Sequence, residues 1–66
     1  MHIHLNGEAR EVAEPITIAE LLESAGYAQR RVAVEVNRDI VPKSQHSAHR
    51  LHDGDRVEIV QAIGGG

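Results

Sequence analysis

The stretch that decides the fold is ITIAELLESAG, residues 16–26. Thr17 is a good N-cap residue, and Glu20 follows three positions later, which is the spacing of a capping box. The apolar residues of the stretch recur at helical spacing and form one stripe. Gly26 is suited to end a helix, because glycine adopts a left-handed conformation without steric cost. The stretch therefore predicts a single helix over about residues 18–25 that buries one face.

Before this helix, the sequence predicts a β-hairpin. Apolar and polar residues alternate over residues 1–5, as they do in a strand with one buried face. Asn6-Gly7 is a strong turn signal, because both residue types tolerate positive φ. We expect the return strand to cover about residues 8–12, with Val12 facing the core.

After the helix, the alternation of valines with other residues predicts a strand over residues 32–36. Residues 37–39 are expected to turn the chain, and residues 40–41 to pair briefly. Residues 43–50 are polar and show no firm period, which predicts a loop or a single helical turn, with Leu51 as its buried anchor.

The last strand is predicted over about residues 56–62, after a turn at Asp53-Gly54-Asp55. Val57 and Ile59 are expected to face the core. The order of elements is then ββαβ, a loop and a final β. This order predicts an α+β domain in which one helix covers one face of a sheet and leaves the other face open.

The open face and the end of the chain point to binding rather than to catalysis. Glu58, Val60 and Ala62 of the last strand point away from the core. Apolar residues that cluster on a surface beside a mobile segment suggest a docking site. The chain then ends in Ile63-Gly64-Gly65-Gly66, a thin arm that could enter a narrow slot. The alternative is a frayed terminus or a cloning remnant.

Composition excludes several classes of function. The 66 residues make one domain without cysteine, so disulfides and thiol chemistry are excluded. The net charge is −3, and Tyr27 is the only aromatic residue, so nucleic acid is not expected as a partner. No apolar run approaches the ~20 residues of a membrane helix, and no signal peptide is seen, so we expect a cytoplasmic protein without a membrane partner. We also expect no room for a deep pocket of ~300–1,000 Å³, which argues against a self-contained enzyme.

The five histidines invite a metal hypothesis. His46, His49 and His52 are three residues apart, but the turn that follows would end any helix carrying them, and no further ligand completes a set. We expect them to be solvated loop residues. His2 and His4 are expected to be exposed by strand alternation, so no metal site is predicted.

Several of these features together resemble a known family. They are the hairpin and capped helix, the string Asn37-x-x-Ile40-Val41-Pro42, the turn at residues 53–55 and the final Gly-Gly. The chain resembles, over essentially its whole length, the ThiS-type sulfur carrier proteins, which are ubiquitin-like β-grasp proteins of thiamine biosynthesis. The resemblance implies a mixed four- to five-stranded sheet with one helix on one face. It implies a β-grasp domain over residues 1–63 and a flexible glycine tail over residues 64–66.

The family also implies a chemistry. A ThiF-like adenylating enzyme would use ATP to convert the Gly66 carboxylate to a glycyl adenylate, and a sulfur donor enzyme would replace AMP to leave a thiocarboxylate (1-thioglycine). A ThiG-like thiazole synthase would take that sulfur for the thiazole ring of thiamine. The chain is then expected to be a protein cosubstrate, not an enzyme, with covalent groups at its terminus and no bound cofactor.

The resemblance assigns the site residues as well. Gly64, Gly65 and Gly66 would enter the partner's active site. The docking surface would contain Glu58, Val60, Ala62 and Ile63. Carriers of this kind often have an aromatic residue near Val60, and valine predicts a weaker contact. Two alternatives stay open: a molybdopterin-synthase-type sulfur carrier, and a non-catalytic ubiquitin-like interaction domain that needs no free C-terminus.

Overall fold

The computed structural model describes residues 1–61 and contains five strands and two short helices in that part of the chain. They are β1 (His2–Leu5), β2 (Glu8–Glu11), α1 (Ile18–Ser24), β3 (Val32–Val36), β4 (Asp39–Val41), the 3₁₀ helix η1 (Lys43–Gln45) and β5 (Arg56–Gln61).

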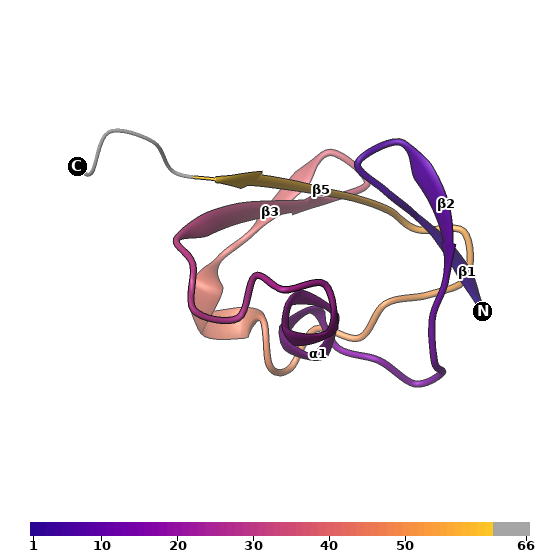
Figure 1. Cartoon of the computed structure of the whole chain (residues 1–66), viewed down its shortest axis with the longest axis horizontal. Coiled ribbons are helices and arrows are strands. Elements are labelled where there is room, and N and C mark those ends of the chain that lie inside the picture. Colours follow the sequence, from indigo (N-terminus) through magenta and orange to yellow (C-terminus); the bar gives the residue numbers. More distant parts are fainter. Residues whose placement is uncertain (62–66) are drawn as a thin grey trace.

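The five strands form one mixed sheet in the order β2-β1-β5-β3-β4. The first and last strands pair in parallel at the centre, and the other pairs are antiparallel. Figure 1 shows α1 lying across one face of this sheet. The predicted α+β architecture, one helix on a four- to five-stranded sheet, is therefore confirmed. Neither helix within residues 1–61 is long and apolar enough to cross a membrane.

The helix begins as its sequence predicts. The backbone N–H of Glu20 donates to Thr17 Oγ1 at 3.2 Å, and the backbone N–H of Thr17 donates to Glu20 Oε1 at 2.9 Å. This reciprocal pair is the capping box. At the other end the last helical residue is Ser24, one residue earlier than predicted, and Ala25 is the C-cap. Gly26 follows with φ +88°. A frayed last turn commonly differs by one residue in this way.

The predicted hairpin also forms. Asn6 and Gly7 have φ of +51° and +85°, the positive values that a tight hairpin turn requires. The return strand ends at Glu11, one residue earlier than predicted, although the N–H of Val12 still donates to the carbonyl of Met1 at 2.9 Å. Val12 is half-buried and packs against the core.

The core lies between α1 and the covered face of the sheet. It consists of aliphatic side chains at alternate strand positions and along the apolar stripe of the helix, as predicted. Leu51, the predicted anchor of the long loop, is among them. Its members are Ile3, Leu5, Ile16, Ile18, Leu21, Leu22, Val34, Val36, Val41, Leu51, Val57 and Ile59.

The loop between β4 and β5 folds back onto the start of α1. The N–H of Ile18 donates to the carbonyl of His49 at 3.0 Å, and the N–H of Ala19 donates to the carbonyl of His46 at 2.9 Å. These bonds satisfy two of the N–H groups that the first turn of a helix leaves without partners. The expectation that the loop histidines are solvated is wrong for His46, which is buried with its Nε2 3.0 Å from the carbonyl oxygen of Val41.

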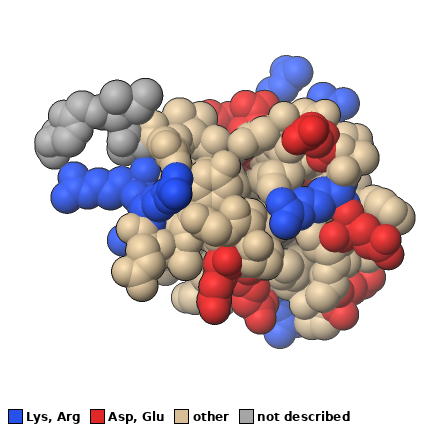
Figure 2. All heavy atoms as spheres, in the orientation of Figure 1, with Lys and Arg blue, Asp and Glu red and all other residues tan. Residues whose placement is uncertain are grey.

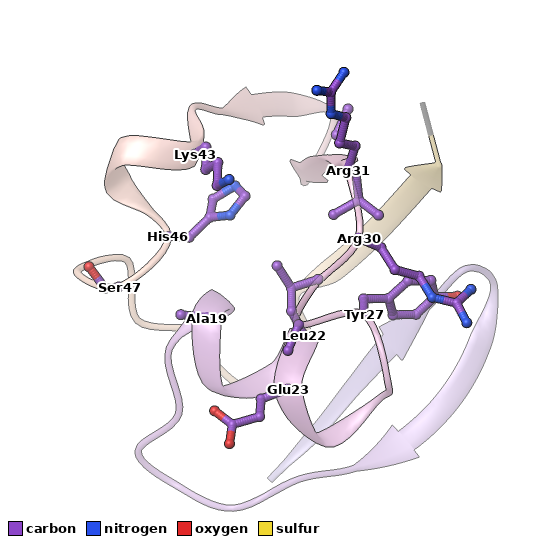
Figure 3. A pocket seen from close by; sticks show the side chains of 12 residues that line it. Ala19, Leu22, Glu23, Tyr27, Arg30, Arg31, Lys43, His46 and Ser47 are labelled. Atoms are coloured by element: carbon purple, nitrogen blue, oxygen red, sulfur yellow. The ribbon is translucent and has the colours of Figure 1, made fainter. Parts of the chain in front are cut away.

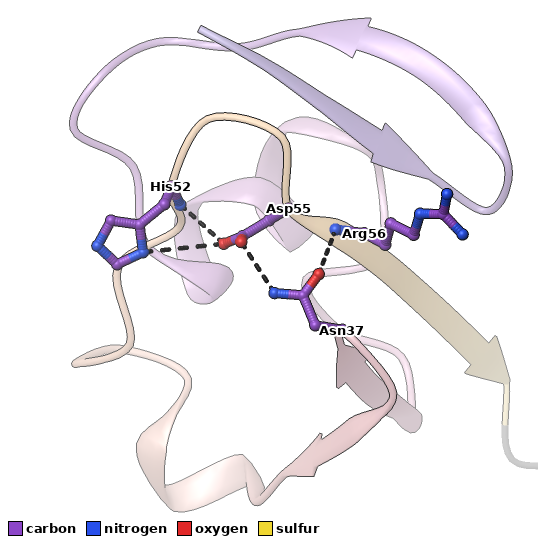
Figure 4. A network of polar contacts seen from close by, with 4 residues as sticks. All are labelled: Asn37, His52, Asp55 and Arg56. Atoms are coloured by element: carbon purple, nitrogen blue, oxygen red, sulfur yellow. Dashed lines mark hydrogen bonds and ion pairs between the residues drawn. The ribbon is translucent and has the colours of Figure 1, made fainter.

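A buried carboxylate joins the two turns that precede β4 and β5 (Figure 4). Asn37 Nδ2 donates to Asp55 Oδ1 at 3.0 Å, and the N–H of His52 donates to Asp55 Oδ2 at 2.8 Å. The N–H of Arg56 in turn donates to Asn37 Oδ1 at 3.0 Å. Asn37 has φ +51°, a conformation that asparagine adopts more readily than most residues. The network fixes the start of β5 against the end of β3.

Candidate functional site

Strand β5 lies at the centre of the sheet and divides its side chains between the two faces. Val57 and Ile59 are buried in the core, whereas Glu58 is exposed and 57% of Val60 is exposed. The predicted orientation of these four residues is therefore confirmed. Ala62 lies outside the described residues.

The strand register brings further residues onto the open face beside Val60. Ala33 is directly opposite Val60 on β3, and Glu35 is directly opposite Glu58. Ile40 on β4 is in turn opposite Glu35, and 71% of it is exposed. Together these five residues, Val60, Ala33, Ile40, Glu58 and Glu35, form the open-face patch.

Three members of this patch, Ala33, Glu35 and Ile40, were not predicted as site residues. The signal for them was present in the sequence, because Val34, Val36 and Val41 face the core and their neighbours must then face outward. What the sequence did not provide was the pairing of β3 with β5, which connects residues more than twenty positions apart.

The two glutamates of the patch form a like-charged cross-strand pair. Directly opposed residues of antiparallel strands have Cβ atoms ~4.5–5.5 Å apart, and like charges at that spacing are destabilising. Glu35 is half-buried and Glu58 is exposed. The pair does not stabilise the sheet, and it places two negative charges beside the apolar residues of the patch. A cation placed over it would be attracted to both carboxylates.

The predicted arm, which starts at Ile63, follows β5 along the chain. Gln61, the last residue of the strand, pairs with Val32 at the start of β3, so the chain continues from this end of the sheet (Figure 1). The predicted site residues Ala62, Ile63, Gly64, Gly65 and Gly66 lie outside the described residues.

The covered side of the molecule contains a groove that the sequence did not predict (Figure 3). It has a volume of about 670 Å³ and lies between α1, the 27–33 segment and η1. The expectation is that the chain has no room for a deep pocket, and this groove, which is open to solvent, does not contradict it. Its apolar lining includes Leu22, Tyr27 and Val32, and Arg30 and Lys43 are among its charged residues.

The histidines do not gather into a ligand set in the part of the chain that the structure describes. No group of three or more histidine, aspartate or glutamate side chains in residues 1–61 is placed to hold a metal ion. His52 Nδ1 lies 3.9 Å from Asp55 Oδ2, but most of the His52 side chain is exposed. The Nε2 atom of His46 is engaged in a hydrogen-bonding contact with the carbonyl oxygen of Val41.

Comparisons with known proteins cover the whole chain. The model of the ThiS family matches residues 3–66. The sulfur carrier protein ThiS of Escherichia coli is 38% identical over 66 residues, which are all of both chains. The crystal structure of a thiamine biosynthesis protein (ThiS) from Geobacter metallireducens superposes with a TM-score of 0.87 at 35% identity, again over both full chains.

A longer protein also matches. A thiazole synthase of Paramagnetospirillum magneticum is 46% identical over all 66 residues of this chain. This chain spans only a fifth of that protein, and also a fifth of a second thiazole synthase, from Magnetococcus marinus. A domain similar to this one therefore occurs within a larger polypeptide.

Proposed function

Because the chain belongs to the ThiS family, we propose that it is a sulfur carrier protein of thiamine biosynthesis whose reactive group is the Gly66 carboxylate. The observation that carries this proposal is the similarity to the E. coli sulfur carrier over the full length of both chains. The β-grasp body, residues 1–63, serves as the docking domain, and residues 64–66 are the arm that enters a partner's active site.

The chemistry requires activation before sulfur transfer. A C-terminal carboxyl group has a pKa of about 3.3–3.7, so it is ionised at neutral pH and resists nucleophilic attack. In the first step a carboxylate oxygen of Gly66 attacks the α-phosphorus of ATP, and pyrophosphate leaves. In the second step hydrosulfide attacks the acyl carbon, the bond from that carbon to AMP breaks, and AMP leaves with the electron pair. The products are a thiocarboxylate on Gly66, AMP and a proton.

The arm suits this exchange for steric reasons. Gly64, Gly65 and Gly66 have no side chains to obstruct the acyl carbon. An extended run from Ile63 to Gly66 reaches on the order of 13 Å, at ~3.3 Å per residue. This length carries the carboxylate beyond the end of β5 and into a partner. The reaction is assigned to the cytoplasm, which supplies ATP.

The open-face patch is the proposed docking surface for the enzymes that use the arm. Val60 and Ile40 offer apolar contact area, and Ala33, directly opposite Val60, adds a small apolar side chain beside it. A partner that places a lysine or arginine over Glu35 and Glu58 would neutralise their repulsion, which favours the complex over the free domain. Ala62 and Ile63 would extend the contact toward the arm.

Three partners follow from this proposal: a ThiF-like adenylating enzyme, a sulfur donor enzyme and a ThiG-like thiazole synthase. The third is supported by the thiazole synthases that contain a region similar to this whole chain. In this scheme the chain supplies no catalytic group of its own, and each enzyme performs its step on the inserted arm.

Intact-protein mass spectrometry tests the proposal directly. The chain is incubated with a ThiF-like enzyme, ATP and sodium sulfide. We expect the mass to increase by that of one sulfur minus one oxygen, with fragmentation locating the change at Gly66. The matched control adds one alanine after Gly66, which should abolish the change without altering the circular dichroism spectrum. Absence of both adenylate and thiocarboxylate on the unmodified chain would refute the carrier function.

A further inference from the structure

The end of the sheet at which β5 finishes carries a cluster of cations. Gln61 pairs with Val32, so Arg30 and Arg31, which immediately precede Val32, lie at the end of the sheet from which the arm continues. Lys43, at the start of η1, lines the same groove as these two arginines (Figure 3). Figure 2 shows blue side chains gathered at this end of the molecule.

The positive charge of this cluster is opposite in sign to the net charge of the whole protein. The chain has a net charge of −3, yet three of its seven lysine and arginine residues line this one groove. Glu23 is the only acidic residue in the lining. Arg30, Arg31 and Lys43 are exposed, and neither Arg30 nor Lys43 forms an ion pair with another residue in the described range 1–61.

The interior of the groove differs from its rim. Leu22, Tyr27 and Val32 contribute apolar surface, and His46 closes one side with its ring held by the Val41 carbonyl. With a volume of about 670 Å³ the groove is wide enough for side chains of another protein. A complementary segment would carry acidic residues beside at least one apolar residue.

We propose that this cationic groove binds an acidic segment of the thiazole synthase, at the mouth of the site that receives the arm. The inference rests on the proposed function. Thiazole synthase is favoured as the partner because domains similar to this chain occur within thiazole synthase polypeptides.

The groove and the open-face patch then make two contacts of opposite sign. The patch presents Glu35 and Glu58, whereas the groove presents Arg30 and Lys43 on the other side of the sheet end. A partner that matches both signs holds the domain in one orientation, because a rotated domain would bring like charges together. A fixed orientation of the domain also fixes where the end of β5, at Gln61, stands relative to the partner's active site.

The test measures the dissociation constant of purified thiazole synthase for the full chain by isothermal titration calorimetry. The variant is Arg30→Glu/Lys43→Glu. The matched control is Arg10→Glu/Arg50→Glu, which makes the same change in net charge at exposed positions outside the groove. We expect the groove variant to bind about tenfold more weakly and to lose the part of the salt dependence of binding that comes from the groove, while the control stays within about threefold.

A milder pair, Arg30→Gln/Lys43→Gln, should give an intermediate loss, and it keeps the test valid if the double reversal does not fold. Thermal melting by circular dichroism establishes folding for each variant. The inference is overturned if the groove variants bind thiazole synthase with the dissociation constant of the wild type. It is also overturned if the control variant loses as much affinity as the groove variant. A loss confined to adenylation, with unchanged binding to thiazole synthase, also overturns it.

The proposed function fails separately from this inference. If the unmodified chain forms no thiocarboxylate, the carrier function is refuted, whatever the binding data show. If the thiocarboxylate forms normally and the groove variants bind thiazole synthase as tightly as wild type, only the groove assignment is lost.

Discussion

Replacing Asp55 with alanine should destabilise the domain more than any other change of a charged residue in the turns. The side chain is 12% exposed and accepts hydrogen bonds from Asn37 Nδ2 at 3.0 Å and from the N–H of His52 at 2.8 Å. Alanine leaves both donors without their acceptor. Each partly buried donor left in this way costs about 1–3 kcal/mol, and water entering the vacated space recovers part of that. We therefore expect a loss of about 2–4 kcal/mol in the free energy of unfolding.

This loss is large for so small a domain. Folded proteins have about 0.05–0.15 kcal/mol of stability per residue, which for this chain is on the order of 3–10 kcal/mol in total. A loss of 1 kcal/mol lowers the melting temperature of a domain of this size by about 4–8 °C. Asp55→Ala should then melt at least about 8 °C below wild type. The sheet register that holds Val60 beside Ala33 should weaken with it.

Urea denaturation at pH 7, followed by circular dichroism, measures this effect. Asp53→Ala is the matched control, because Asp53 lies in the same turn and is exposed, and its Oδ1 accepts one bond, from the N–H of His2 at 2.8 Å. The control substitution should lower the free energy of unfolding by about 0.5–1.5 kcal/mol, which is the usual net contribution of one hydrogen bond. If the two variants have equal stability, the argument that Asp55 joins the two turns is wrong.

Three other predictions concern the helix cap and the open face. Thr17→Ala removes the capping bond to the N–H of Glu20 and should cost about 1 kcal/mol in urea denaturation, whereas an unchanged midpoint would deny the cap a role. Glu35→Gln/Glu58→Gln removes the like-charged pair, so it should raise the free energy of unfolding of the free domain by about 0.2–1 kcal/mol. The same variant should bind the adenylating enzyme more weakly in calorimetry, and tighter binding would contradict the proposed basic contact. Val60→Asp should leave the melting temperature within a few degrees but lower the rate of thiocarboxylate formation at least about tenfold by mass spectrometry, and a normal rate would exclude Val60 from the docking surface.

The elements that sequence alone predicted are those whose signals are local. The capping box of Thr17 and Glu20, the Asn6-Gly7 turn and the alternation of valines over residues 32–36 each depend on residues within a few positions of one another. Their local preferences agree with the final packing, so the boundaries are correct to within one or two residues.

The features that sequence did not reveal depend on distant contacts. His46 reads as a solvated loop residue, and it is buried because its loop folds back to supply carbonyl acceptors to the first turn of α1. The pairing of Glu35 with Glu58 requires the register between β3 and β5. The cationic groove requires η1 to lie near the 27–33 segment, and no pattern within either segment indicates that proximity.

The central position of β5 has a mechanical consequence. The strand is hydrogen-bonded to β1 on one side and to β3 on the other, and its pairing with β3 extends from Val57 to Gln61. Tension applied along the chain beyond Gln61 therefore pulls parallel to these ladders and loads many hydrogen bonds at once in shear. An edge strand pulled at right angles would instead lose its bonds one after another. The domain is thus built to stay intact under tension applied through the segment after Gln61, which is the load that the proposed insertion of the arm into a partner would impose.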